Sequence, residues 1–264
     1  EIAPGELVEI TADEVRGTQL LEPAPQPSPC VFELVYFARP DSTVFGQNVH
    51  GARGRMGEEL ALEDLRRDGH NHHADVVVPV PDSGIPAALG YMRKSQLPYD
   101  KAILRSHYFG RTFILPNSDE RASGVRLKLS VNREAVRDRR VLLVDDSLVR
   151  GNTARQIVQM VREAGAKEVH FRSASPPIKH PDFYGIDMPT VDQLMAAQMT
   201  LEEMRKSLGV DTLGFLSVDG LYHAMGEQQR NAENPQFTDH AFTGEYPTPL
   251  LDHSSDRAAK DFQL

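Results

Sequence analysis

The feature that most constrains the fold is a strand–loop–helix pattern that occurs twice along the chain. Residues 75–80 and 140–144 are short apolar runs, and each is followed by a polar loop, at 81–84 and at 145–153. Apolar residues then recur at helical spacing in two stripes: Ile85, Ala88, Leu89, Met92, and Ala154, Ile157, Val158, Val161. Gly165 and another apolar run at 167–172 follow the second stripe. Strands that alternate with helices at this spacing predict an α/β fold with a parallel sheet.

The remaining segments divide the chain into two parts. Residues 6–10 alternate like a short strand without a partner, and residues 22–29 carry four prolines, which predicts an extended linker. We therefore expect a remnant strand and linker over 1–29 and one domain over 30–264. Within it we expect a strand at 30–37, a helix at 55–68 that ends at Gly69, and a polar C-terminal extension.

Composition narrows the class of protein. The formal net charge of −9 argues against a nucleic-acid partner, and the chain lacks the apolar run of ~20 residues that a membrane span needs. The single cysteine, Cys30, excludes an intrachain disulfide and is more simply a small buried hydrophobe than a nucleophile. We expect a reduced, cytoplasmic protein that holds any anionic ligand through local groups.

The strongest candidate site is the run VLLVDDSLVRGNT at residues 141–153. Asp145 and Asp146 stand at the carboxyl end of a predicted parallel strand, where open α/β sheets bind ligands. Gly151 and Thr153 open the following helix, whose free N–H groups and positive dipole end favour a phosphate. A bare Asp-Asp pair could simply cap a helix, but carboxylates beside a phosphate cradle suit a sugar phosphate.

A second candidate is the turn at 81–84, which again joins a strand to a helix. The N–H groups of Ser83 and Gly84 could hold a diphosphate, and the Ser83 hydroxyl could reach a metal shell with Asp145 and Asp146. Mg²⁺ prefers a few such oxygen ligands together with waters and substrate phosphates. Many strand–helix turns carry Asp-Ser-Gly, so this turn indicates function only in combination with the first loop.

A third candidate is the long polar segment 105–129. Its basic residues could neutralise a leaving pyrophosphate and its aromatic residues could exclude water on closing, although a solvated surface loop is the simpler alternative. The residues concerned are Arg111, Arg126 and Lys128, with Tyr108, Phe109 and Phe113. We expect the segment to be mobile and to close over bound substrate. His70, His72 and His73 lack the spacing of a helical zinc pair and more simply belong to a loop.

The Asp-Asp loop resembles the signature of type I phosphoribosyltransferases that binds 5-phosphoribosyl 1-pyrophosphate (PRPP). Other motifs occur in the order found in the C-terminal half of the glutamine PRPP amidotransferase family. They are FARPDS at 37–42, MG at 56–57, PVPDSG at 79–84, YFGRTFI at 108–114, VRLKL at 125–129, YGID at 184–187 and FTGEYPT at 242–248. The resemblance covers nearly the whole chain.

The resemblance implies a type I phosphoribosyltransferase fold, with a parallel sheet flanked by helices and a small hood, and transfer of the phosphoribosyl group from PRPP. It implies catalytic roles for Asp145, Asp146, Tyr108 and Arg111. It implies substrate binding by Asp82, Ser83, Gly84, Arg126, Lys128, Ser147, Val149, Arg150, Gly151, Asn152 and Thr153. Mg²⁺ would be held by Ser83, Asp145 and Asp146. A homo-oligomer is expected.

Three departures from the family pattern modify these expectations. No N-terminal glutaminase domain is recognised, so ammonia becomes the expected nucleophile, unless a separate glutaminase subunit docks. Of four cysteines that ligate an iron–sulfur cluster in some members only Cys30 remains, because Asp182, Thr238 and Ala241 occupy the other places, so no cluster is expected. Residues 105–107 and Asn152 also differ from the usual motif. The alternatives are a salvage phosphoribosyltransferase acting on a free base and a non-catalytic PRPP or nucleotide sensor.

Overall fold

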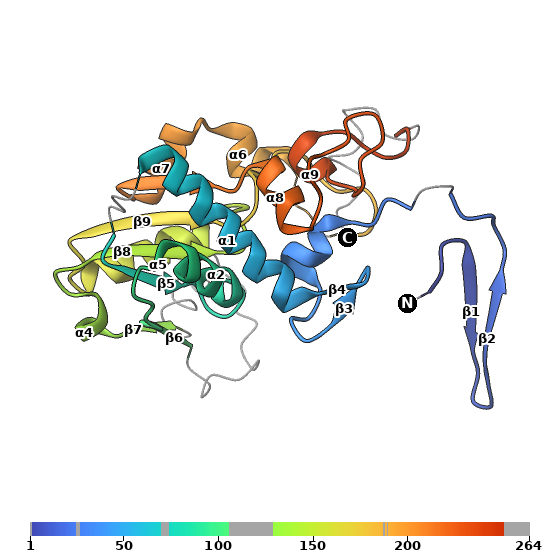
Figure 1. Ribbon diagram of the computed structural model, residues 1–264, viewed down its shortest axis with the longest axis horizontal. Helices are drawn as coiled ribbons and strands as arrows, with labels where there is room; N and C mark the ends of the chain where they lie inside the picture. The colour runs from blue at the N-terminus through green and yellow to red at the C-terminus, as the bar shows by residue number, and fades with distance from the viewer. Residues whose placement is uncertain are drawn as a thin grey trace.

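The computed structural model describes residues 2–24, 27–69, 74–105, 129–186, 188 and 190–250. Its centre is a sheet of four parallel strands in the order β10-β9-β8-β5 (Figure 1). These strands are β5 (Val76–Pro79), β8 (Arg140–Asp145), β9 (Glu168–Ser173) and β10 (Thr212–Phe215). The parallel sheet predicted from the repeated strand–loop–helix pattern is confirmed, and β10 is a strand that the pattern did not reveal.

Helices cover both faces of this sheet, because alternate residues of a strand point to opposite sides. Val77 and Leu142 pack with α1 (Val49–Asp68), α2 (Ile85–Ser95) and α8 (Val218–Ala224). Val76 and Leu143 pack with α5 (Asn152–Glu163) and α7 (Leu201–Leu208) on the other side. The result is the three-layer arrangement expected of an α/β fold.

The predicted helices differ from the observed ones in their ends and in one buried face. Helix α1 begins at Val49, where the Asn48 side chain accepts a hydrogen bond from the Gly51 N–H at 2.9 Å, and it ends at Gly69 as predicted. The predicted stripe of α5 is buried throughout. In α2, however, Ala87 and Tyr91 are fully buried, whereas three of the four predicted positions, Ile85, Leu89 and Met92, are only partly buried.

Small residues explain why the α2 prediction failed. A Cβ atom at Gly57 would collide with the Ala87 backbone, and one at Gly90 would collide with the Gly54 backbone. Helices α1 and α2 therefore cross with their backbones in close approach. The face that packs on α1 is built from glycine and alanine, which an apolar-periodicity argument does not detect.

The segment 30–37 was predicted as a strand, and that prediction is wrong. Residues Glu33–Phe37 form a short helical segment, η1, and Cys30 makes only an isolated bridge to Thr238. The buried residues are Val31, Phe32, Leu34 and Val35, a pattern of i, i+1, i+3 and i+4 that is typical of a helix. Tyr36 and Phe37 point outward and are 49% and 43% exposed.

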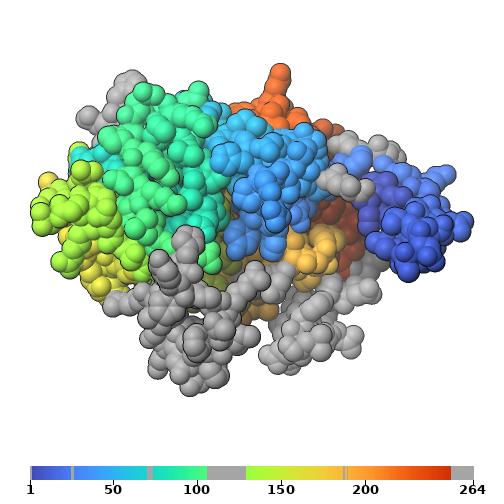
Figure 2. Space-filling view, turned by 90° about the horizontal axis from the view of Figure 1, so that it is seen from below, coloured from blue at the N-terminus to red at the C-terminus, as the bar shows by residue number. Residues whose placement is uncertain are grey.

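The N-terminal strand was predicted to be unpaired, and that is also wrong. β1 (Glu6–Ile10) pairs antiparallel with β2 (Val15–Gln19), forming a hairpin at one end of the molecule (Figures 1 and 2). Its apolar residues are largely uncovered, since Ile10 is 77% and Val15 71% exposed. The hairpin therefore contributes little to the core.

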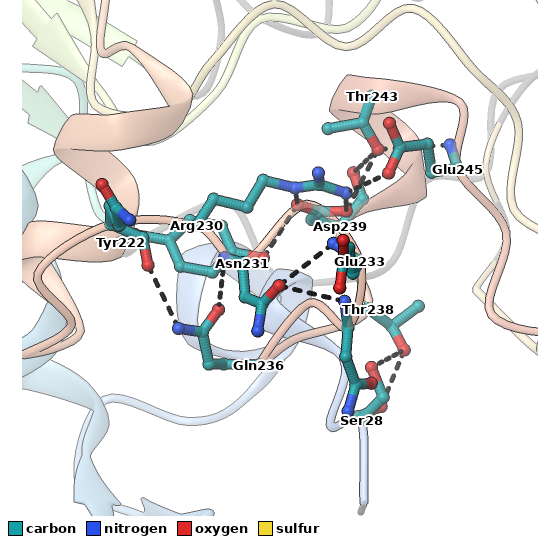
Figure 3. A network of polar contacts seen from close by, with 12 residues as sticks. Ser28, Tyr222, Arg230, Asn231, Glu233, Gln236, Thr238, Asp239, Thr243 and Glu245 are labelled. Carbon is teal, nitrogen blue, oxygen red and sulfur yellow. Dashed lines mark hydrogen bonds and ion pairs between the residues drawn. The ribbon is translucent and has the colours of Figure 1, made fainter.

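A buried polar network holds the C-terminal part of the described chain to the rest of the fold through hydrogen bonds (Figure 3). The Asp239 carboxylate, 2% exposed as a residue, accepts hydrogen bonds from Tyr222 Oη at 2.9 Å and from Arg230 Nε at 2.6 Å. The Thr238 hydroxyl donates to the Ser28 carbonyl at 2.7 Å, which fastens the end of the proline-rich linker to this network.

Smaller elements complete the described chain. They are β3 (Thr43–Val44), β4 (Gln47–Asn48), β6 (Ile103–Arg105), β7 (Leu129–Val131), α4 (Arg133–Val136), η2 (Val191–Gln193), α6 (Met195–Gln198) and α9 (His240–Thr243). In the described ranges, no helix has the length and apolar character that crossing a membrane requires.

Candidate active site

A cavity of about 930 Å³ opens where β5 and β8 end. Its floor is formed by residues 145–156, which follow β8, and by Val80, Pro81 and Ser83, which follow β5. The aromatic side chains Phe32, Tyr36 and Phe37 form one wall, and Ile186 and Met188 also line the cavity. The site therefore lies at the carboxyl ends of neighbouring parallel strands, as predicted from the sequence.

The two aspartates of the first loop differ in their surroundings. Asp146 is only 5% exposed, and its Oδ1 accepts a hydrogen bond from the Ser147 hydroxyl at 2.5 Å. The Ser83 hydroxyl, from the turn after β5, lies close enough to the Asp146 carboxylate to lower the pKa of that group. Asp145 lies at the end of β8, and its Oδ1 accepts the N–H of Asp146 at 2.9 Å. The structure thus joins the two predicted loops at one carboxylate.

Burial controls the ionisation of this pair. Loss of water and the neighbouring charge of Asp146 hold the pKa of the Asp145 carboxyl well above its ordinary value. Burial also raises the pKa of Asp146, against the opposing effects of the Ser147 and Ser83 hydroxyls and the positive charge of Arg53. Two adjacent carboxylates in such a position favour a bound cation, which would offset their mutual repulsion.

The phosphate cradle predicted at 147–153 lines the same cavity. Gly151 directly precedes α5 as its N-cap residue, with φ +75, and no side chain caps the first turn of this helix. A Cβ atom at Gly151 would lie 2.6 Å from Met195 Sδ, so any other residue would have to displace Met195 and adopt a left-handed backbone that favours glycine. The Met195 N–H donates to the Val149 carbonyl at 2.9 Å, which holds the loop from α6. Ser147, Arg150, Asn152 and Thr153 complete this part of the lining.

The turn after β5 corrects part of the sequence prediction. The Gly84 N–H donates to the Val80 carbonyl at 3.0 Å, so it is used within the turn and does not face a diphosphate. Gly84 is required for another reason, because a Cβ atom there would collide with the Val144 carbonyl. Ser83 does line the cavity, whereas the exposed Asp82 carboxylate pairs with Arg105 Nη1 at 2.9 Å. The Pro81–Asp82 peptide bond is cis.

Only the two ends of the long segment are described. Arg105 and Leu129 face each other in the antiparallel pair β6–β7, and Arg105 also joins this pair to the turn after β5 through Asp82. These two described ends therefore lie next to the turn after β5. The remaining predicted residues, Tyr108, Phe109, Arg111, Phe113, Arg126 and Lys128, lie outside the described residues, as do His70, His72 and His73.

Sequence reasoning missed the aromatic wall and a buried arginine. Tyr36 and Phe37 contact each other edge-to-face, with ring centroids 5.3 Å apart, and both line the cavity. Arg53 in α1 is 3% exposed and interacts electrostatically with Asp146. The helical spacing of buried residues at 31–35 could have revealed the wall, but nothing local to residue 53 indicates its position near the site.

The four positions aligned with cluster-ligating cysteines occupy one region. Cys30 bridges to Thr238, and Asp182 pairs with the buried His240 at 2.8 Å, next to Ala241 in α9. Burial raises the pKa of the Cys30 thiol, and the Asp182 charge adds to that effect. Asp182 is thus already engaged with a side chain of α9. The absence of an iron–sulfur cluster stays a prediction.

Comparisons with known proteins agree with this geometry. A family model described as a phosphoribosyl transferase domain matches residues 54–174. An amidophosphoribosyltransferase of Rhizobium etli is 53% identical over 261 residues, which is 97% of this chain and 51% of that protein. The Bacillus subtilis protein of the same name is 46% identical over 250 residues, which is 95% of this chain and 51% of that protein.

A solved structure is also similar over nearly the whole chain. It is the glutamine PRPP amidotransferase from B. subtilis complexed with ADP and GMP, with a TM-score of 0.81 and 44% identity over 96% of this chain and 54% of that one. The chain spans about half the length of the curated relatives it matches. The chain therefore carries a type I phosphoribosyltransferase domain and is a homologue of about half of an amidophosphoribosyltransferase.

Proposed function

We propose that this chain transfers the phosphoribosyl group of PRPP to ammonia, giving 5-phosphoribosylamine and pyrophosphate, the first step of de novo purine synthesis. The observation that carries the proposal is that a carboxylate pair, with Asp146 buried and Asp145 partly buried, and a helix N-terminus free of any side-chain cap meet on the floor of one cavity. The first group suits ribose hydroxyls and the second suits the 5′-phosphate. Homology to proteins named amidophosphoribosyltransferase supports the same reaction.

Mg²⁺ fits the donor set of this site. Asp145 and Asp146 offer carboxylate oxygens and Ser83 offers a hydroxyl, whereas the described residues contain no group of three or more His, Cys, Asp or Glu that could enclose a metal. Mg²⁺ prefers few protein oxygens together with waters and substrate phosphates. When bound, the ion would supply positive charge against the pyrophosphate.

The protein residues account for the other requirements of the reaction. The carbon–oxygen bond between C1 and pyrophosphate breaks with its electron pair on the pyrophosphate, and the ammonia lone pair forms the carbon–nitrogen bond before a proton leaves. Asp145 and Asp146 would fix the ribose hydroxyls and stabilise positive charge developing at C1. The aromatic wall of Tyr36 and Phe37 would limit water beside C1. Tyr108, Arg111, Arg126 and Lys128 are proposed to contact the pyrophosphate, on the strength of the sequence resemblance alone.

The aromatic wall also favours a second candidate. A salvage phosphoribosyltransferase needs an apolar surface for a free base, and Phe32, Tyr36 and Phe37 offer one beside the carboxylates. Pyrophosphate release from PRPP and Mg²⁺ separates the candidates when it is measured with ammonium, with glutamine, with free purine bases and with no addition. We expect release with ammonium that increases at alkaline pH, where more ammonia is free. Release only with a base would establish the salvage reaction instead, and binding without release would indicate a sensor.

We also propose that residues 1–29 form a unit separate from the phosphoribosyltransferase domain, joined to it at Ser28 by the hydrogen bond from Thr238. Strands β1 and β2 pair with each other, and their apolar side chains Leu7, Ile10 and Val15 are exposed. An isolated two-stranded hairpin is marginally stable. Deleting residues 1–24 should leave the unfolding free energy of the remainder almost unchanged, as measured by urea denaturation. A large loss would contradict the proposed division.

A further inference from the structure

Arg53 is a buried cation that neither the sequence motifs nor the proposed chemistry uses. It lies in the first half of α1 and is 3% exposed. Its Nε donates to the Leu34 carbonyl at 3.0 Å and its Nη2 donates to the Ala38 carbonyl at 2.9 Å. Burying a guanidinium is costly unless its hydrogen bonds are made, so this placement requires a compensating reason.

The two carbonyls belong to the segment that forms the aromatic wall. Leu34 lies inside η1 and Ala38 follows its last residue. The Arg53 guanidinium therefore binds the backbone on both sides of Tyr36 and Phe37. These two rings are exposed and line the cavity, so the packing of their own side chains restrains them little. The planar guanidinium holds two acceptors in fixed geometry, which an ammonium group does not.

The same guanidinium also acts on the floor of the cavity through its positive charge. The positive charge of Arg53 favours the ionised form of Asp146, and the charge of Asp146 in turn favours the cationic form of Arg53. Arg53 therefore binds the aromatic wall through hydrogen bonds and acts on the floor of the cavity through the electrostatic effect of its charge.

We propose that Arg53 is a positioning residue of the active site, which fixes the aromatic wall of η1 relative to the carboxylate floor at Asp146. The inference rests on the proposed function, because phosphoribosyl transfer at C1 requires the aromatic wall and the carboxylate floor to keep a fixed position relative to each other. A displacement of about 1 Å far from the reacting atoms can cost on the order of 10²-fold in rate.

Kinetics of two Arg53 variants test the proposal. Arg53→Met removes the fork and the charge, and we expect kcat to fall at least tenfold with KM for PRPP changed less than threefold, because the phosphate cradle at α5 is untouched. Arg53→Lys keeps the charge but cannot hold both carbonyls in the same geometry, and we expect an intermediate kcat. Assays are made well below the unfolding temperature of each variant.

Arg172→Met is the matched control. Arg172 is also buried, at 5% exposure, and its Nε donates to Asp64 at 2.6 Å on a part of α1 that does not line the cavity. This variant should lose stability yet keep kcat. If Arg53 only supported the fold, its variants would behave like Arg172→Met, and wild-type kcat in both Arg53 variants would overturn the proposal.

A structural readout separates this inference from the proposed function. The chain contains no tryptophan, so Phe37→Trp places a single fluorescent reporter in the wall. We expect acrylamide quenching of this reporter to rise at least twofold when Arg53→Met is added and to stay unchanged with Arg172→Met. If Arg53→Met does not fold, Arg53→Lys is judged by the same quenching and kcat criteria.

The two readouts then give distinct outcomes. Increased quenching in a chain that shows no turnover of PRPP would sustain the anchoring role of Arg53 and reject the proposed reaction. Unchanged quenching together with unchanged kcat would reject the anchoring role and leave the reaction standing.

Discussion

Helix α1 carries a buried charge in each half, and the two charges are used differently. Near its C-terminal end, Asp64 accepts hydrogen bonds from Tyr91 Oη at 2.7 Å and Arg172 Nε at 2.6 Å, and it also pairs with Arg67. Near its start, Arg53 acts through its charge on Asp146, whose carboxylate accepts a hydrogen bond from the Ser147 hydroxyl and is also stabilised by the Ser83 hydroxyl. One carboxylate is saturated by strong cationic donors, and the other is not.

The difference shows how burial can serve structure or chemistry. Asp64 and Arg172 neutralise each other inside the fold, and neither lines the large cavity. Asp146 is equally buried as a residue but lines that cavity, with a partner, Asp145, of the same charge. A carboxylate whose acceptors are filled by arginine stabilises contacts, whereas one held by hydroxyls beside a like charge keeps acceptor capacity for a ligand.

The comparison predicts its largest effect at Asp64. Asp64→Asn leaves the Arg172 guanidinium buried without its counter-charge, and breaking a buried pair in this way costs about 3–5 kcal/mol of unfolding free energy. The turnover of the folded fraction should change little. Urea denaturation measures the loss.

The exposed pair of Asp75 and Arg140, with side chains 40% and 37% exposed, is the control for Asp64. Asp75→Asn should cost no more than about 1 kcal/mol. Equal losses from the two substitutions would mean that burial does not set the strength of the Asp64 network.

At Asp146 we expect the opposite result, a large loss of activity with little loss of stability. Asp146→Asn should lower PRPP turnover by about 10²-fold or more, because a preorganised electrostatic contact at a reacting centre is worth a few kcal/mol. Since burial raises the pKa of the Asp146 carboxyl, folding opposes its ionisation at neutral pH, and the amide should leave stability equal or slightly higher. Steady-state kinetics and urea denaturation together test this. Full activity, or an unfolded variant, would contradict the functional assignment.

A smaller effect is expected at the start of α5. Gly151→Ala must adopt a left-handed backbone conformation, which costs about 1–2 kcal/mol, and its Cβ would also displace Met195. Gly209→Ala is the matched control, because Gly209 has a similar φ of +72 and no atom within 4 Å of the added Cβ. Both variants should lose similar backbone stability, but only Gly151→Ala should raise KM for PRPP. Equal KM values would mean that the cradle does not bind the phosphate.

Local patterns in the sequence predict the sheet and the first loop well. The strand at 140–144 and the α5 stripe follow from apolar spacing alone, and the position of Asp145 at a strand end follows from chain order. The prediction failed where the packing surface is not built from large apolar side chains. The glycines and alanines between α1 and α2, and the short helix η1 in a β-rich composition, are cases where tertiary contacts override local preference.

Contacts between distant segments account for what the sequence does not reveal about the site. The contact between Ser83 and Asp146 joins two loops through residues 63 positions apart, and nothing in either loop specifies it. The electrostatic effect of Arg53 on Asp146 and the hydrogen bond from the Met195 N–H to the Val149 carbonyl likewise depend on how the helices pack. Motifs identify which residue types are present, whereas the fold decides which of them share a cavity.

The smallest predicted effect concerns the pH dependence of stability without ligand. An acid whose pKa is raised by folding binds more protons in the folded state, so its contribution to stability is present below about pH 4 and is lost as pH rises through the folded pKa. Asp145 and Asp146 both have this sign.

Asp145→Asn removes the larger share, so the unfolding free energy of the wild type should fall relative to that of the variant between about pH 4 and neutrality. His240, whose pKa is lowered by burial, has the opposite sign and is common to both proteins. Urea denaturation of the two proteins across this range measures the difference, and parallel pH profiles would show that the carboxylate pair is not held in a costly ionised state.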